Sequence, residues 1–419
     1  MDLKITRARL LGQTGLWDIG IEGGRITAVG DSVETPATTT VDAAEKLVLP
    51  GLVDGHIHLD KALILERHPA ITGSFKEAMD RTLEIKKTFS QEDIQTRGRL
   101  VLERAIAFGI TAMRSHVEVD PSIGLTGLKA LLPLCQDYAW GITLQLAAFA
   151  QEGITNQAGV EPLLREAMAM GATVIGSAPY VDPNPAQNVQ IIFDIAQDFD
   201  CDVDFHLDFL DDEAPLLLPF VLEETARRGW QGRVCLGHMT KLAGLAPTEL
   251  ESIAAAIDQT GVSILALPAS DLYMMARKDT HNVRRGVAPV HRLADMGVNT
   301  GVAVNNIQNL FTPFGDGDIL KICTLLAQVL QLGTPRSHEL CLEMATTRAA
   351  RAIGLHNHTI TPGSIADLVI LDAQSATAAV ATAPINRTVI KQGQIVAQTQ
   401  VKQQLFNHAN QENDSTYQI

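Results

Sequence analysis

The sequence predicts an α/β protein, a (β/α)8 TIM barrel with a small β-sandwich domain formed by both chain ends. Three observations support this fold. Apolar runs rich in β-branched residues alternate with helix-like segments through the middle of the chain. Glycines precede many of these runs, as is typical where a helix ends. Short strands with alternating polarity stand before and after this region. We expect residues 1–49 and 361–419 to form the small domain and residues 50–360 the barrel.

The middle of the chain contains the eight apolar runs that a barrel requires. They begin near Leu52, Thr111, Ile142, Ala172, Cys201, Arg233, Val262 and Val298. Residues 160–170 and 248–257 are examples of the helix-like segments between them. An open, doubly wound sheet is the alternative, but no G-x-G-x-x-G motif follows the first strand. Eight strand–helix alternations therefore favour the closed barrel.

The flanking regions predict the strands of the small domain. Residues 3–6, 17–21 and 25–29 alternate between polar and apolar side chains and are separated by turns. The same pattern returns at residues 366–372 and 388–396. We expect these two sets of strands to pair. Residues beyond about 400 are rich in Gln and Asn, which predicts a polar arm or a disordered tail.

Composition narrows the classes of function. The 419 residues carry a formal net charge of −15, which argues against nucleic acid or an anionic membrane as a partner. Five cysteines without a C-x-x-C pair indicate reduced thiols in a cytoplasmic protein. We expect no signal peptide and no membrane span, because no apolar stretch has the required length. We also expect the protein to form a homo-oligomer.

Two histidines one residue apart, His56 and His58, end the first apolar run of the barrel region. Side chains of a strand repeat every two residues, so both rings would leave the same face. At the carboxyl end of a buried strand, two imidazoles are placed to hold a divalent metal ion. The H-x-H motif is weak by itself, and two structural histidines are the alternative interpretation.

Further polar side chains stand where later strands are expected to end. They are His116, Gln151, His206, Asp208, His238, Asn305 and Asn306. The carboxyl ends of barrel strands meet at the face where the chemistry of this fold takes place. Histidines at four of the eight strand ends therefore favour a shared metal site over isolated structural histidines.

Several segments together are typical of one family: residues 50–61, 115–119, 148–154, 202–208, 305–318 and 366–371. On these segments, which span nearly the whole chain, the sequence resembles the amidohydrolase superfamily. The resemblance is to the branch of bacterial cytosine deaminases and N-isopropylammelide hydrolases. The segment Ala148-Phe-Ala-Gln-Glu-Gly-Ile154 is quite specific to the cytosine deaminases. The resemblance implies one divalent transition metal ion, zinc or iron, and a small heterocyclic substrate.

The resemblance also implies roles for individual residues. His56, His58 and His206 would bind the metal, and Asn305 stands where the family has an aspartate ligand. His238 would bond the attacking hydroxide or the developing oxyanion. The substrate would be bound by Gln151, which offers both a donor and an acceptor to an amide-like edge, and by Asn306, Phe209 and Phe311. Phe311 stands where cytosine deaminases cover the substrate ring with an aromatic side chain.

Two departures from the family pattern affect proton transfer. The family's strand-eight aspartate takes a proton from bound water, but the neutral amide of Asn305 cannot. Cytosine deaminases carry a glutamate proton shuttle at the position of Phe209. Each such contribution is typically worth about 10²–10⁴ in rate. Asp208, which shares a strand face with His206, is the nearest substitute base.

Three functional hypotheses follow. The first is a metal-dependent hydrolase that cleaves a non-peptide C–N bond of a small nitrogen heterocycle, such as a pyrimidine or triazine. Metal-bound hydroxide would attack the ring carbon, and ammonia or an amine would leave, as in cyclic amidine deaminases. The second is a catalytically silent barrel that binds a heterocyclic metabolite, suggested by Asn305 and Phe209. The third is a hydrolase that opens the ring of a cyclic amide.

Overall fold

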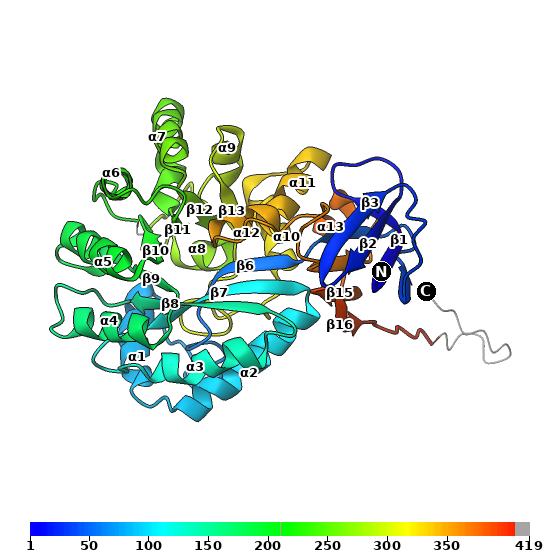
Figure 1. Ribbon diagram of the computed structural model, residues 1–419. Coiled ribbons are helices and arrows are strands. Elements are labelled where there is room, and N and C mark those ends of the chain that lie inside the picture. The colour runs from blue at the N-terminus through cyan, green and yellow to red at the C-terminus, as the bar shows by residue number, and fades with distance from the viewer. Residues whose placement is uncertain (210, 407–419) are drawn as a thin grey trace.

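The computed structural model describes residues 1–209 and 211–406, and one of its two eight-stranded sheets is a parallel barrel (Figure 1). Eight strands lie side by side in chain order: β6 (Leu52–Ile57), β7 (Ile110–Glu118), β8 (Thr143–Ala150), β9 (Val174–Ser177), β10 (Asp202–Leu207), β11 (Val234–His238), β12 (Ser263–Ala266) and β13 (Thr300–Val302). A parallel bridge between Ile57 and Asn305 joins the first strand to the segment after the last. The predicted barrel is thereby confirmed, with strands close to the eight predicted starts.

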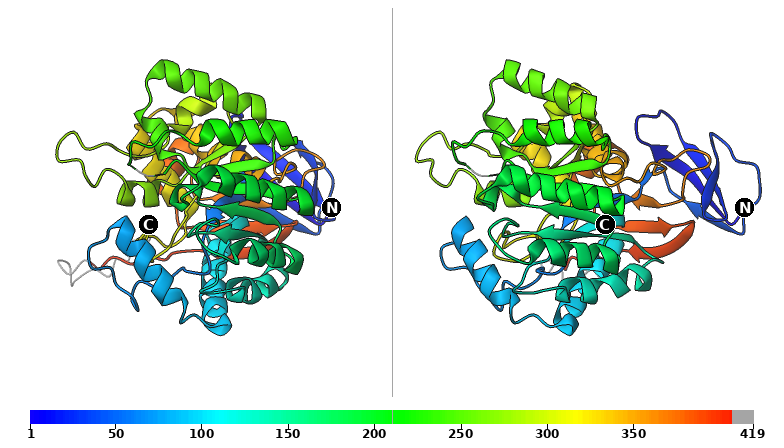
Figure 2. Two further views of the ribbon diagram at one scale, coloured as in Figure 1. Left: turned by 90° about the vertical axis from the view of Figure 1, so that its left-hand side faces the viewer. Right: turned by 60° about the vertical axis from the view of Figure 1, so that its left-hand side comes forward.

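Helices surround the barrel and connect its strands (Figure 2). The predicted helical segments are confirmed as α4 (Val160–Met170) and α7 (Pro247–Thr260), and Gly261 ends α7 with a φ of 65°. The other helices are α1 (Phe75–Lys86), α2 (Gln91–Ala107), α3 (Thr126–Asp137), α5 (Pro185–Phe199), α6 (Leu218–Arg228), α8 (Pro268–Met274), α9 (Val290–Asp295), α10 (Ile319–Leu330), α11 (Pro335–Met344), α12 (Thr347–Ala352) and α13 (Ala376–Thr382). Short 3-10 helices occupy Pro179–Val181 and Thr240–Gly244. Apolar side chains of these helices and of the strands form one large core.

The second sheet contains strands from both ends of the chain, as predicted. Its order is β16-β15-β14-β5-β1-β2-β3, with β4 beside β1. The N-terminal strands are β1 (Leu3–Leu10), β2 (Trp17–Glu22), β3 (Arg25–Gly30), β4 (Thr39–Asp42) and β5 (Leu47–Pro50); the C-terminal strands are β14 (Leu368–Leu371), β15 (Arg387–Lys391) and β16 (Gln394–Thr399). Their apolar side chains form a separate core that includes Ile5, Val48 and Ile390. Residues 407–419, which include most of the predicted tail, lie outside the described residues.

Lys391 of β15 fastens the second sheet to the barrel. Its ammonium group lies 2.6 Å from the Asp367 carboxylate and donates to the Thr111 carbonyl of β7 at 3.0 Å. Because Lys391 and Asp367 are both buried, this contact fixes the two sheets against each other more firmly than an exposed ion pair would. The mixed sheet thus supports the barrel at a distance from the histidines.

All five cysteines carry free thiols, and four of them are buried. Within residues 1–209 and 211–406, no helix is both long enough and apolar enough to cross a membrane.

Candidate metal centre

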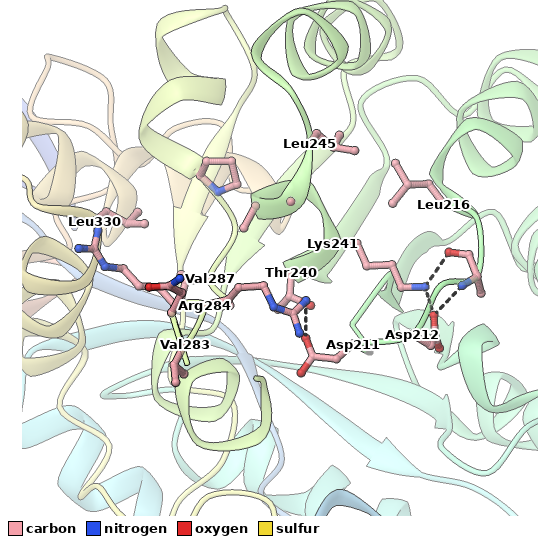
Figure 3. A pocket seen from close by; sticks show the side chains of 17 residues that line it. Asp211, Asp212, Leu216, Thr240, Lys241, Leu245, Val283, Arg284, Val287 and Leu330 are labelled. Carbon is pink, nitrogen blue, oxygen red and sulfur yellow. Dashed lines mark hydrogen bonds and ion pairs between the residues drawn. The ribbon is translucent and has the colours of Figure 1, made fainter. Parts of the chain in front are cut away.

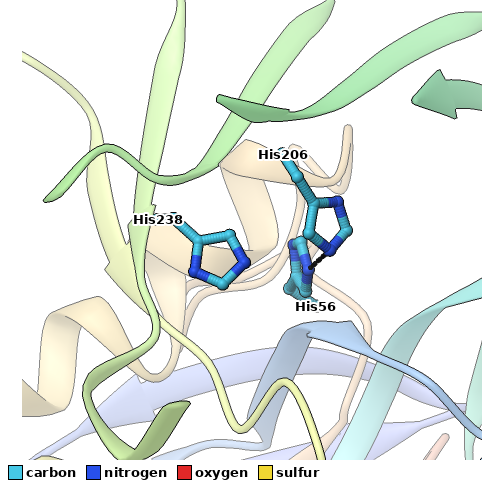
Figure 4. A group of neighbouring side chains, drawn as sticks. All are labelled: His56, His206 and His238. Carbon is cyan, nitrogen blue, oxygen red and sulfur yellow. Dashed lines mark hydrogen bonds between the residues drawn. The ribbon is translucent and has the colours of Figure 1, made fainter. Parts of the chain in front are cut away.

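Three histidines from two barrel strands converge at the carboxyl end of the barrel. His56 lies on β6, His58 directly follows this strand, and His206 lies on β10. The Nε2 atom of His206 lies 2.9 Å from Nε2 of His56 and 3.1 Å from Nε2 of His58. The rings are 0%, 1% and 3% exposed. Figure 4 shows His56 and His206 directed at each other, with His238 beside them.

The backbone around the cluster allows this close approach. His56 and His58 are two residues apart, so the pleat directs both rings to the inside of the barrel, as predicted. On strand β11, Gly237 faces the His56 ring. A Cβ atom at this position would lie 2.7 Å from Cε1 of His56, a distance that real contacts essentially never show. A glycine is therefore needed here to leave room for the ligand-like ring.

The protonation of the cluster suits a cation. Burial, reinforced by the neighbouring imidazoles and other cations, holds the pKa of His56, His58 and His206 well below its ordinary value. Neutral imidazoles are the form that coordinates metals. In the described part of the chain, the Nδ1 atoms of all three rings are buried without a hydrogen-bond partner. The neutral Nε2 atoms of His56 and His58 lie within 3.1 Å of Nε2 of His206, and such a group of nitrogens fits a divalent transition metal ion.

His238 lies at the end of β11 and is oriented by a buried carboxylate. Its Nδ1 atom lies 2.7 Å from Oδ1 of Asp271, and Oδ2 of Asp271 accepts the backbone N–H of Leu267 at 3.2 Å. With Nδ1 engaged, Nε2 is the ring nitrogen left for the cavity. His238 also adopts a φ of 73°, an uncommon conformation for a residue with a side chain, and such strain is typical of functional sites. Asp271 was not predicted, since it comes from helix α8 rather than from a strand end.

A small cavity lies over the histidines. It is lined by His58, Lys61, Phe75, Gln151, Tyr180, His206, Phe209, His238, Ser270, Met274, Asn305, Asn306 and Phe311. The space in the cavity that accepts the centre of a water molecule is only about 20 Å³. A heterocycle would therefore need the side chains that cover the cavity to move apart.

One side of the cavity carries the predicted substrate-binding residues Gln151 and Phe311 together with a lysine. Lys61 donates to Oε1 of Gln151 at 3.2 Å and to Oε1 of Glu118 at 2.6 Å. Its ammonium nitrogen also lies 4.6 Å from the centre of the Phe311 ring. Lys61 was missed in the sequence analysis, although it stands three residues after His58 in the segment that carried the family resemblance.

Phe209 and Asn306 also line the cavity, whereas Asp208 does not. The Phe209 ring packs on His238 with 4.2 Å between ring centres. Asp208 turns away from the cavity lining, because its two carboxylate oxygens accept the backbone N–H groups of Leu217 and Leu218 at the start of α6. We therefore propose a structural role for Asp208 in place of the base expected from the sequence. His116 is buried within β7, 3.1 Å from Asp204.

A cluster of buried charges lies next to the cavity and was not predicted. The ammonium group of Lys86, on α1, lies 2.8 Å from Glu118, 2.6 Å from Asp120 and 2.6 Å from Glu152. Lys61 contacts the second oxygen of Glu118. Three carboxylates this close resemble a cation site, but the ammonium of Lys86 already stands among them. Glu118 could have been predicted from the sequence, because it follows His116 by two residues on β7 and its side chain therefore leaves the same face of the strand.

A larger cavity of about 890 Å³ lies under the loops after β10 and β12 (Figure 3). It contains the acidic residues that follow Phe209 in the sequence. Asp212 pairs with Lys241, and Asp211 lies 3.5 Å from Arg284. These charges are paired with each other, whereas the histidine cavity is lined by His58, His206 and Asn305, each with a buried polar atom that has no hydrogen-bond partner among the described residues.

A (β/α)8 barrel that gathers buried histidines at its strand ends is typical of metal-dependent hydrolases. Residues 47–396 match the model of the Amidohydrolase family. The chain belongs to this family, in agreement with the resemblance found in the sequence.

Three relatives of this chain are named for different heterocyclic substrates. The chain is 30% identical to N-isopropylammelide isopropyl amidohydrolase of Pseudomonas sp. (strain ADP), over 96% of this chain and 98% of the relative. It is 27% identical to a pterin deaminase of Rhizobium rhizogenes, over 90% and 87% of the two chains. A crystal structure of 5-methylcytosine deaminase from Klebsiella pneumoniae with 5-fluorocytosine is 30% identical, with a TM-score of 0.90, covering 97% of this chain and 100% of that chain.

Proposed function

We propose that this protein is a metal-dependent hydrolase that cleaves a non-peptide C–N bond of a small nitrogen heterocycle, such as a pyrimidine, a triazine or a pterin. The observation that carries the proposal is the convergence of His56, His58 and His206 beneath a small cavity that Gln151 and His238 also line. Relatives that match nearly the whole chain are named for C–N hydrolysis of such rings. A cytoplasmic location and a homo-oligomeric state stay predictions.

One divalent ion, zinc or iron, would be held by His56, His58 and His206. Three neutral imidazoles suit both metals, and their burial keeps the ligand nitrogens free of protons. When bound, such an ion activates water for attack on an electrophilic carbon at neutral pH. The protein's own contribution is to orient the substrate, exclude bulk water and move protons.

His238 is the residue that we assign to proton transfer. The Asp271 carboxylate at 2.7 Å fixes the imidazole by its Nδ1 atom and favours a proton on that nitrogen. Nε2 is then able to accept a proton from the attacking water, and the Asp271 carboxylate stabilises the imidazolium that forms. Since Asn305 and Phe209 offer no base, we assign to the His238–Asp271 pair the part that carboxylates play elsewhere in the family.

The substrate would be held by polar groups on one side of the cavity and by aromatic rings on the others. Gln151 presents an amide, which pairs with the alternating donors and acceptors at the edge of a nitrogen heterocycle. The ammonium of Lys61 suits a ring oxygen that carries negative charge. Phe209 and Phe311 provide flat apolar contacts for the ring faces.

The cover of the cavity would exclude water during the reaction. Phe75 of α1, Met274 of α8 and Phe311 all line the space over the histidines, and the ring centres of Phe75 and Phe311 are 6.2 Å apart. Because little of the cavity admits even water, we infer that the cover opens for the substrate and closes over it.

A turnover assay tests the proposal. The protein would be purified without chelator and incubated with cytosine, isocytosine, ammelide-type triazines, pterins and hydantoin-like rings. We expect release of ammonia or an amine from at least one ring, and loss of that release in His206→Ala. Absence of turnover on every ring, with ligand binding retained, would contradict hydrolysis and favour the silent barrel. A carboxylate product without ammonia or amine would favour ring opening.

A further inference from the structure

Asn305 is held firmly between the two histidines of the H-x-H motif. Its backbone N–H donates to the carbonyl of His56 at 2.8 Å, and its own carbonyl accepts the N–H of His58 at 2.9 Å. Its φ of 69° is a left-handed conformation that asparagine tolerates better than most residues. These two hydrogen bonds fix the Asn305 backbone, and with it the Cβ atom, beside the backbone of both histidines.

The Asn305 amide is asymmetric in its contacts. Nδ2 donates to the hydroxyl of Ser270 at 2.8 Å, and this hydroxyl lies 2.6 Å from the hydroxyl of Thr312. Oδ1 is also buried, yet no other atom of the described residues hydrogen-bonds to it. Asn305 lines the same cavity as His58 and His206. A buried carbonyl oxygen without a partner is costly, and such groups call for a water or an ion.

The hydroxyl pair accounts for this orientation of the amide. Ser270 is able to accept the amide N–H while giving its own proton to Thr312, so the amide nitrogen is satisfied on that side. Ser270 and Thr312 are each 1% exposed, so water does not compete for these bonds. The oxygen is therefore the amide atom left without a protein partner.

We propose that Ser270 is a positioning residue that fixes the Asn305 amide so that Oδ1 serves as a neutral oxygen ligand to the metal. This inference rests on the proposed metal site at His56, His58 and His206. Three imidazoles and an amide carry no charge, so the ion keeps its full double positive charge. A carboxylate ligand at this position would halve that charge. The site would therefore favour substrates that carry negative charge.

Zinc affinity tests the proposal without any substrate. The zinc dissociation constant would be measured by competition with a chromophoric chelator, and the ligand field by visible absorption of the cobalt(II) form. We expect Ser270→Ala to weaken zinc binding by about 10- to 100-fold and to change the cobalt spectrum. Ser270→Thr, which keeps the hydroxyl, should restore both measurements to near the wild-type values.

A double-mutant cycle separates positioning from general damage to the site. Asn305→Leu, which removes the amide at similar size, should weaken zinc binding at least as much as Ser270→Ala. In the Asn305→Leu background, Ser270→Ala should have no further effect, because the group that Ser270 orients is gone. Thermal unfolding of the zinc-free proteins reports whether each variant folds.

Four outcomes overturn the inference. Wild-type zinc affinity in Asn305→Leu contradicts it even if Ser270→Ala fails to fold. Wild-type zinc affinity in folded Ser270→Ala contradicts the role of Ser270. The same role is contradicted if Ser270→Ala weakens zinc binding as much in the Asn305→Leu background as in the wild type. In these cases the wild-type protein still binds zinc and the proposed metal site stands. If the wild-type protein itself binds neither zinc nor cobalt, the proposed metal site fails together with the inference.

Discussion

Two clusters of buried polar side chains lie side by side at the carboxyl end of the barrel, and they differ in how far their members satisfy each other. In the cluster of Lys61, Lys86, Glu118, Asp120 and Glu152, opposite charges meet at 2.6–2.8 Å. In the cluster of His56, His58 and His206, three neutral nitrogens of the same kind face one another.

The difference separates a structural cluster from a functional one. Buried charges persist in proteins when they are paired, and each carboxylate of the lysine–carboxylate cluster has an ammonium partner. Two neutral imidazoles can share one hydrogen bond, but three converging nitrogens cannot all be satisfied by each other. We propose that a divalent cation completes the histidine cluster. Proximity of acidic residues alone would have indicated the wrong cluster as the metal site.

The largest expected effect is on turnover and comes from His238, which borders the histidine cluster. His238→Asn should lower kcat/KM by about 10²–10⁴, because it removes the group that we assign to proton transfer. The metal content should stay at the wild-type value, since His238 is not among the three proposed ligands. Steady-state kinetics and metal analysis of the same preparation check both parts. Loss of the metal together with turnover would make His238 a ligand instead.

Breaking the charged cluster should affect stability rather than metal binding. Lys86→Met leaves the buried carboxylates of Asp120 and Glu152 without their cation, while Glu118 keeps Lys61, and we expect a loss of about 3–5 kcal/mol in the free energy of unfolding. Lys87→Met is the matched control. Lys87 is exposed and pairs only with Glu84, so its loss should cost about 0–1 kcal/mol. Denaturant titrations measure both values, and equal losses would contradict the contrast between the sites.

The charged cluster should also give a defined dependence of stability on pH. Burial and the neighbouring Glu118 raise the pKa of Glu152 from 4.5 to about 7, against the effect of Lys86. Between these pH values the folded protein keeps the Glu152 proton while the unfolded chain releases it, so this group lowers stability as pH rises. Glu152→Gln removes the titration. Its free energy of unfolding, relative to wild type, should therefore rise by about 1–3 kcal/mol between pH 4.5 and 7. A constant difference across this range would contradict the raised pKa.

Much of the barrel and of the histidine cluster was predictable, because periodicity and strand order carry that information. The apolar runs marked the strands, and the spacing of His56 and His58 placed both rings on one face. His206 followed from its place at the end of a later strand. His238 and Gln151 followed in the same way, and the family resemblance added Phe311; all three line the one cavity.

The partners of these residues were not predictable from local patterns. Asp271 and Ser270 come from the short helix α8, and Lys86 comes from α1, so their contacts depend on how helices close over the barrel. Asp208 shares a strand face with His206, yet its left-handed φ of 46° turns the chain toward α6 and gives its oxygens to backbone N–H groups. The sequence identifies which residues reach the end of a strand, but their hydrogen bonds are determined by the loops that follow.

Metal stoichiometry is the most direct test of the claim that the histidine cluster is completed by a cation. Protein purified without chelator would be analysed for zinc and iron by mass spectrometry, beside His206→Ala and Lys86→Met. We predict about one divalent ion per chain in the wild type and in Lys86→Met, and its loss in His206→Ala. A wild-type protein without metal, or a His206→Ala variant that keeps the ion, would contradict the account.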